Sequence, residues 1–177
     1  MVKRWRWRGQ VLTISAEAPQ QPSWRFVLSH PAHFFAFGFG SGLSPAAPGT
    51  AGTLAAFPVF WLMQRLLEPA AFLAVLALMF ALGVWFCAKA GRSLGVADHG
   101  GIVWDEIVAF VAVLFYLPAT PLWWLAGFAL FRLFDIWKPF PIGYLDARLK
   151  NGFGVMLDDA LAALYALIVA RGLSWLL

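Results

Sequence analysis

The sequence predicts an all-α fold: a compact, membrane-embedded bundle of several hydrophobic helices, some of them short or only partly inserted in the bilayer. Of the 177 residues, 62% are hydrophobic and only 12% are charged. The mean hydropathy is +0.75. A soluble domain carries roughly a quarter charged residues, so this chain has too few polar groups to cover its own surface. A soluble all-helical protein with a very apolar core is the alternative.

Residues 1–33 are predicted to form a basic, tryptophan-rich leader that is irregular over residues 1–30. Basic and indole side chains follow one another at its start: Lys3, Arg4, Trp5, Arg6, Trp7 and Arg8. Basic residues attract anionic headgroups and Trp prefers the membrane interface, so the lipid bilayer is the expected partner. The apolar chain behind the leader argues against a nucleic acid as partner. A frayed tail is the alternative, and no apolar run typical of a signal peptide is apparent.

Residues 34–177 are predicted to form a single helical domain. Two apolar segments, 54–67 and 69–88, are separated by a tight reversal at a Glu-Pro pair. The second has twenty residues without charge, which is enough for roughly 30 Å of helix. Lys89 and Arg92 are expected to close it.

Proline divides the apolar stretch that follows. Residues 107–131 carry no charge, but Pro118 and Pro121 interrupt them. Because proline removes a backbone donor and clashes with the preceding turn, two short helices should meet at this break. The expected helices are 105–117, 122–137 and, after a loop, about 155–171.

This order of helices predicts that the polar segments share one face of the membrane, because each pair of helices leaves one side and returns to it. The acidic residues then lie beside a set of basic ones: Lys89, Arg92, Lys138, Arg148 and Lys150. The excess of Lys and Arg in cytoplasmic loops predicts that this face is cytoplasmic.

Five of the nine acidic residues border apolar helices: Asp105, Glu106, Asp135, Asp158 and Asp159. Burying isolated carboxylates is costly, and neighbouring carboxylates repel and raise each other's pKa. A divalent cation removes both penalties, and Mg²⁺ prefers hard oxygen ligands. Some of four aspartates are therefore expected to hold Mg²⁺: Asp105, Asp135, Asp158 and Asp159.

One other reading of these acids remains. They could be solvated helix caps, which suits Asp158 and Asp159 best because the helix dipole favours acids near an N-terminus. A zinc site is disfavoured, since the three histidines lack the spacing of zinc ligands. Arg132 and Lys138 lie three residues before and after Asp135, so these cations are expected beside the acids, at a metal or phosphate site.

The segment GFGSGLSPAAPGTAGTL, residues 38–54, has five glycines. Glycine lets a backbone approach a phosphate closely. Thr50 or Thr53 is expected to cap the helix that follows, whose N-terminus favours an anion. No Lys follows the last glycine, so the segment is not a Walker A loop. A flexible loop combined with close helix packing is the alternative.

Three other phosphatase chemistries lack their motifs. A cysteine phosphatase needs C-x5-R, but Cys87 and Arg92 are separated by four residues, and Cys87 suits packing better. No D-x-D pair and no Arg-Pro pair occur, which excludes the aspartyl-nucleophile and histidine-dependent types. A carboxylate site supported by a metal remains.

Three blocks resemble the phosphatidylglycerophosphatase A family: GFGSGLSPAAPGTAGTL at 38–54, IVWDEIVAF at 102–110, and FRLFDIWKPFPI with GFGVMLDDALA at 131–162. The match covers roughly residues 34–165, and order, spacing and residue type all fit. The resemblance implies an all-helical fold and Mg²⁺-dependent removal of the terminal phosphate from phosphatidylglycerophosphate. The product would be phosphatidylglycerol, in the bacterial inner membrane.

The resemblance also assigns residues. The family's acidic positions match Asp105, Glu106, Asp135, Asp158 and Asp159, all expected to be catalytic. Its phosphate-binding positions are expected to match Thr50, Thr53, Arg132 and Lys138. Glu106 or one aspartate would activate water, and an aspartyl-phosphate is the mechanistic alternative. The chain departs from the family pattern at Ala109 and Ala163, where glycine is usual.

Two further function classes stay open. A small transporter or ion-binding membrane protein could use the same acids, but it would need them in the middle of helices. A structural membrane protein would leave the glycine-rich segment unexplained. The oligomeric state cannot be inferred from these patterns.

Overall fold

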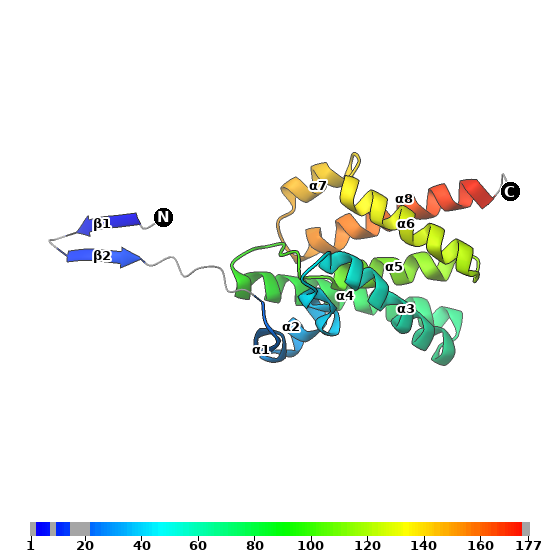
Figure 1. The fold of residues 1–177 in the computed structure, drawn as a ribbon, viewed down its shortest axis with the longest axis horizontal. Coiled ribbons are helices and arrows are strands. Elements are labelled where there is room, and N and C mark those ends of the chain that lie inside the picture. The colour runs from blue at the N-terminus through cyan, green and yellow to red at the C-terminus, as the bar shows by residue number, and fades with distance from the viewer. Residues whose placement is uncertain (1–2, 8–9, 15–21, 175–177) are drawn as a thin grey trace.

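The computed structural model describes residues 3–7, 10–14 and 22–174, and side chains within residues 22–174 (Figure 1). The elements are β1 (Lys3–Trp7), β2 (Gln10–Ile14), α1 (Trp24–Leu28), α2 (Pro31–Ala36), the 3₁₀ segment η1 (Gly38–Leu43), α3 (Pro48–Leu66), α4 (Pro69–Leu94), α5 (Trp104–Tyr116), α6 (Pro121–Trp137), α7 (Ile142–Arg148) and α8 (Gly152–Ser174). The helices form a bundle, which confirms the predicted all-α fold.

The described part of the first thirty residues is not irregular as predicted. β1 and β2 pair as an antiparallel hairpin in which Lys3 lies opposite Ile14. Aromatic and β-branched residues favour this conformation. α1 follows, and its Val27 is fully buried in the hydrophobic core. Arg8 and the side chains of the other leading basic and tryptophan residues lie outside the described residues.

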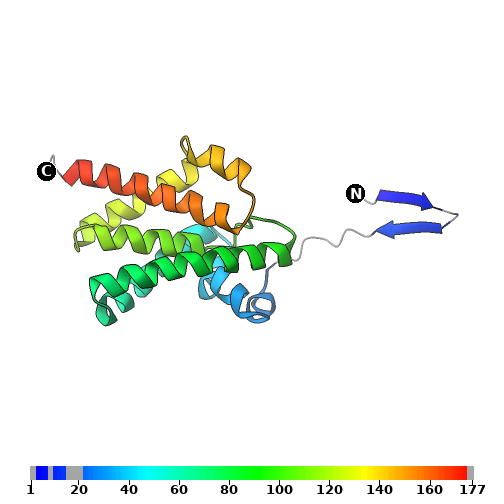
Figure 2. The ribbon, with the colours of Figure 1, turned by 180° about the vertical axis from the view of Figure 1, so that it is seen from behind.

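α5 is the central helix of the bundle. It contacts α2, α3, α4, α6 and α8. From Trp104 to Leu114 every residue except Ala112 is buried. Figure 2 shows α4, α5 and α8 side by side on one face of the bundle. A helix packed against five others must be apolar along most of its length, which explains why the acids of α5 are confined to its first turn.

Local chemistry accounts for most helix boundaries. Pro69 occupies the first turn of α4, where its missing N–H costs nothing, and Gly95 ends that helix in the left-handed conformation at φ 72°. The Thr120 hydroxyl accepts a hydrogen bond from the N–H of Trp123 at the start of α6. α5 and α6 each begin one residue before the predicted position.

Three predictions of local structure need correction. α3 begins at Pro48, so Thr50 and Thr53 lie inside the helix and do not cap it; the left-handed Ala47 turns the chain into the helix earlier. α7 was not expected, because a loop was predicted between the helix that ends at residue 137 and the one that begins near residue 155, whereas α7 lies within that stretch. α8 starts at Gly152, three residues before the predicted position.

α2 spans the predicted domain boundary at residue 33, and that boundary stays a prediction.

The helices alternate in direction, so the starts of α3, α5 and α8 and the ends of α4 and α6 lie at one end of the bundle (Figure 2). This end is here called the site end. It contains the loop at residues 95–103 and the segment 138–151, which includes α7. The far end contains the connection from α3 to α4 and the C-terminus of α8.

Two helices, α4 and α8, are long and apolar enough to cross a bilayer. Only 28% of the most apolar part of α4 is buried inside the bundle, so the helix turns most of its surface outward. Large apolar side chains on that surface include Leu78, Leu82 and Trp85, each about half exposed. Such a surface is suited to lipid rather than water, which supports the predicted membrane association.

We expect Gly152→Ala to destabilise the bundle, because a Cβ there would overlap the carbonyl oxygen of Val84 and lie 2.7 Å from the backbone N of Ala88. Backbone cannot move aside as a side chain can, so the free energy of unfolding should fall by roughly 2 kcal/mol. Gly172→Ala is the matched control in the same helix, since a Cβ there meets nothing within 4 Å. Denaturant unfolding in detergent would contradict this account if both variants were equally stable.

Candidate functional site

The structure brings the five predicted acids together from three helices at the site end. Asp105 and Glu106 lie in the first turn of α5, Asp135 lies near the end of α6, and Asp158 and Asp159 lie in the second turn of α8. All except Asp135 are buried. Asp158 and Asp159 are too far inside α8 to be its caps; the Asn151 side chain instead accepts a hydrogen bond from the N–H of Gly154.

Three of these acids form a tight group, here called the carboxylate trio: Asp105, Glu106 and Asp159. One oxygen from each lies within 4.8 Å of the others. Within the described residues, Asp105 Oδ1, Glu106 Oε2 and Asp159 Oδ2 are buried without a hydrogen-bond partner. Three unpartnered anionic oxygens in an apolar interior suit a hard cation, which would supply the missing interactions.

The pKa values of the two acids in α5 reflect the same crowding of buried carboxylates. Burial, followed by the charge of Glu106, raises the pKa of Asp105 well above its usual value. Burial, followed by the charge of Asp159, likewise raises the pKa of Glu106. Without a counter-charge, both groups therefore resist ionisation at a pH where exposed carboxyls are charged. A bound cation would reverse this preference.

The remaining two acids each pair with a cation. Asp135 lies 2.5 Å from Arg132 NH1, and the Asp158 carboxylate is bonded to Lys138. Asp105 and Asp159 of the predicted magnesium ligands thus lie in the trio, whereas Asp135 and Asp158 lie beside it. Glu106, predicted as a base, completes the trio. The sequence carries no signal for this division, because it depends on how far each helix is rotated.

Arg132 links the acids to the glycine-rich segment. Its NH1 is 3.8 Å from Glu106 Oε1, and its buried Nε has no hydrogen-bond partner among the described residues. A Cβ on Gly49 would overlap Glu106 Oε1 and lie 3.0 Å from Arg132 NH2. A side chain at position 49 would therefore displace the Glu106 carboxylate and the Arg132 guanidinium from their present positions.

The two predicted threonines lie in the first turns of α3. Thr53 is fully buried, and its hydroxyl donates a hydrogen bond to the Gly49 carbonyl at 2.9 Å. Thr50 is half-buried. The first backbone N–H groups of any helix lack partners and carry partial positive charge, so the start of α3 offers donors to an anion beside Arg132. A phosphate contact by either hydroxyl stays a prediction.

Lys138 joins a second group of charges. It ends α6 in the left-handed conformation at φ 46° and lies 3.3 Å from Asp146 of α7 as well as contacting Asp158. Burial alone would lower the pKa of Lys138, but the bond to Asp158 and the two acidic charges raise it above its usual value. Burial alone would raise the pKa of Asp146, but Lys150 and Lys138 lower it below its usual value.

Sequence reasoning missed Asp146, although its spacing of four residues from Lys150 signalled a helical ion pair. The two side chains are 2.8 Å apart. Asp146 shares Lys138 with Asp158, so it helps to fix where the lysine ammonium lies.

Comparison with known proteins gives one family match and several relatives that carry names. The phosphatidylglycerophosphatase A family matches residues 34–174. A Haemophilus influenzae protein named phosphatidylglycerophosphatase A is 49% identical over 88% of this chain and 97% of its own length. The Escherichia coli protein of the same name is 44% identical over 78% and 80%. A Bacteroides thetaiotaomicron protein named as a candidate phosphatidylinositol-3-phosphatase is 38% identical over 79% and 91%. No solved structure matches the chain.

The pairing of Lys138 with the buried Asp158 predicts a measurable difference between two lysines. In EDTA, Lys138→Met should lower the free energy of unfolding by roughly 2 kcal/mol, because it leaves a buried carboxylate without its partner. Lys150→Met removes a half-exposed lysine from an exposed ion pair and should cost less than about 1 kcal/mol.

Adding Asp158→Asn to Lys138→Met should restore most of the lost stability, since the uncompensated charge is then gone. Denaturant unfolding of the three variants in detergent tests this. Equal losses for the two lysine variants, or no recovery in the double variant, would show that Asp158 does not depend on Lys138.

Proposed function

This chain belongs to the phosphatidylglycerophosphatase A family, and we propose that it hydrolyses phosphatidylglycerophosphate to phosphatidylglycerol and inorganic phosphate. Relatives of that name cover most of the chain at 44% and 49% identity, which supports a phosphoric monoester hydrolase. The observation that carries the proposal is the carboxylate trio, buried beside Arg132 and the start of α3 at one end of an outwardly apolar bundle.

The proposed cofactor is Mg²⁺, held by Asp105, Glu106 and Asp159. The unpartnered buried oxygens of these residues support such a site. When bound, Mg²⁺ supplies positive charge against phosphate oxygens and lowers the pKa of a coordinated water.

In the proposed site, groups of this chain bind and orient the substrate phosphate. The first backbone N–H groups of α3 and the free Nε of Arg132 donate hydrogen bonds to its oxygens. Lys138 adds positive charge. These donors stabilise the negative charge on the phosphoryl group during transfer. Asp135 and Asp158 hold Arg132 and Lys138 in position through their ion pairs.

The proposed reaction is hydrolysis of a phosphate monoester. A water oxygen forms a bond to phosphorus while the bond between phosphorus and the terminal glycerol oxygen breaks. A carboxylate of the cluster accepts a proton from the attacking water, and the leaving oxygen gains a proton to become the terminal hydroxyl of phosphatidylglycerol. No redox change occurs, and water is the only co-substrate.

The proposed location is the cytoplasmic face of the bacterial inner membrane. The named relatives are bacterial, and α4 and α8 suit a bilayer. Basic residues gather at the site end, where Lys138 and Lys150 lie beside the acids. An excess of Lys and Arg is typical of cytoplasmic segments.

The transporter hypothesis fits this arrangement less well. A path for ions across the bilayer needs polar groups along the middle of helices. Here the acids gather at the site end, and residues 107–114 in the middle of α5 are all apolar. A phosphate on a lipid headgroup, in contrast, reaches the end of a bundle from the membrane surface.

Magnesium dependence is tested by phosphate release from phosphatidylglycerophosphate in mixed micelles. EDTA should abolish release, and Mg²⁺ should restore it and raise the unfolding temperature. Asp159→Asn should lower kcat by at least about 100-fold and remove that thermal shift. Glu68→Gln changes an exposed acid at the far end and should leave both unchanged.

A panel of lipid phosphates should include phosphatidylinositol-3-phosphate, which the name of the Bacteroides relative suggests. Release that persists in EDTA would contradict the magnesium proposal. Release from other lipids but not from phosphatidylglycerophosphate would contradict the proposed substrate.

The close approach of α3 gives a second test. Gly49→Ala should lower kcat by about 100-fold, because the new Cβ displaces Glu106 and Arg132 from their present positions. Gly100→Ala is the matched control at the site end, since a Cβ there meets nothing within 4 Å. Both activities are measured on protein with a wild-type unfolding temperature. An active Gly49→Ala enzyme would show that α3 does not need to touch the acids.

A further inference from the structure

A largely apolar groove runs along α5 and α8, and α4 borders the first of its two parts. It consists of two adjoining cavities of about 340 and 630 Å³, which share Leu164 and Leu167 of α8. Small side chains make room for the first cavity: Ala77, Ala109, Ala112, Ala160 and Ala163. The larger Leu73 and Phe80 of α4 form its opposite side.

The groove begins within one helical turn of the carboxylate trio along α5 and α8, although none of the three acids lines it. On α8, Ala160 directly follows Asp159, and Ala163 lies one helical turn further on. On α5, Val108 and Ala109 lie one turn beyond Asp105 and Glu106. Residues three or four apart share a helix face. The same faces of α5 and α8 therefore carry first the acids and then the groove.

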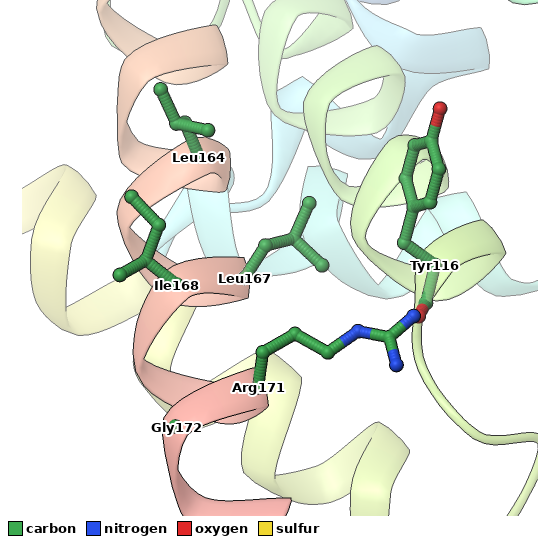
Figure 3. Close-up of a pocket in the computed structure, with 6 residues that line it drawn as sticks. All are labelled: Tyr116, Leu164, Leu167, Ile168, Arg171 and Gly172. Atoms are coloured by element: carbon green, nitrogen blue, oxygen red, sulfur yellow. The ribbon is translucent and has the colours of Figure 1, made fainter.

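The other end of the groove lies at the C-termini of both helices. Figure 3 shows Tyr116 of α5 and Arg171 of α8 beside Leu164, Leu167 and Ile168. Arg171 NH2 donates a hydrogen bond to the Tyr116 carbonyl at 3.0 Å, which joins the two helix ends. Twelve residues of helix separate Asp159 from Arg171, or about 18 Å. One leaflet of a bilayer has about 15 Å of hydrocarbon.

We propose that this groove binds one acyl chain of the phospholipid substrate while the substrate's phosphate lies at the carboxylate trio. The inference rests on the proposed function and adds a second binding subsite to it. Acyl chain and phosphate belong to one molecule, so a ligand of this kind requires an apolar channel that leads away from a polar site. The groove has that form, direction and length.

A protein helix fits the groove less well. A helix is about 10 Å wide with its side chains, and one seated along the whole groove would extend over the acids and obstruct the approach of phosphate. A single hydrocarbon chain fills the space between alanine side chains without covering the trio. An acyl chain bound in this way would hold the phosphate of the same lipid molecule beside the carboxylate trio at each turnover.

The test compares a lipid with its deacylated headgroup. Ala112→Leu and Ala77→Leu place larger side chains in the groove. Each should lower kcat/KM for dioleoyl phosphatidylglycerophosphate by about tenfold, the scale of a misfitted apolar pocket. Hydrolysis of glycerophosphoglycerophosphate, which has no acyl chains, should keep its wild-type rate. Ala77 is exposed, so Ala77→Leu keeps the test valid if Ala112→Leu fails to fold.

Ala74→Leu is the matched control, because Ala74 is exposed on α4 and lines neither cavity. It should hydrolyse both substrates at the wild-type rate. The groove proposal is overturned if folded Ala77→Leu hydrolyses the long-chain lipid like Ala74→Leu, or loses activity equally on both substrates. If the wild-type enzyme hydrolyses neither substrate, the proposed function is refuted instead, and the groove proposal with it.

Discussion

The structure depends on holding like charges together inside an apolar bundle. Asp105, Glu106 and Asp159 have oxygens within 4.8 Å of one another, and each has an oxygen buried without a partner among the described residues. Mutual repulsion and lost hydration both oppose this arrangement. It persists because α5 is enclosed by five other helices and because Arg132 and Lys138 supply positive charge at its border. The polar end of the bundle is thus stabilised by the apolar packing behind it.

Close backbone contact sets the positions of these charges. Gly49 lets the start of α3 approach Glu106 and Arg132, and Gly152 lets the start of α8 lie against the backbone of α4. Gly49 is the second residue of α3 and Gly152 is the first residue of α8, and both helices contribute to the site. A methyl group at position 152 would displace the start of α8, and one at position 49 would displace the side chains of Glu106 and Arg132. Within the glycine-rich segment, Gly49 thus provides close packing directly beside the predicted site, so close packing and a role at the site are compatible.

The sequence was sufficient to predict the all-α bundle and the meeting of its acids. Proline and charge mark the ends of α5 and α6, and alternating helix directions bring their polar ends together. Other features depend on information that local patterns lack. The left-handed Ala47 starts α3 before the threonines expected to cap it. The division of the acids into a trio and two ion pairs depends on helix rotation. A loop was predicted where α7 lies, because prolines precede this segment, and α7 supplies Asp146.

The membrane explains why the polar and apolar features occur in one small domain. In water, the exposed leucines of α8 and the alanine-lined groove beside them would favour aggregation. In a bilayer they are in contact with hydrocarbon, and only the two ends of the bundle have to meet water. A lipid substrate is divided in the same way, with a charged phosphate at one end and apolar chains at the other. The gradient from acids to apolar groove along α5 and α8 therefore matches the substrate along its length. The bilayer that stabilises the groove surface also delivers the molecule proposed to fill it.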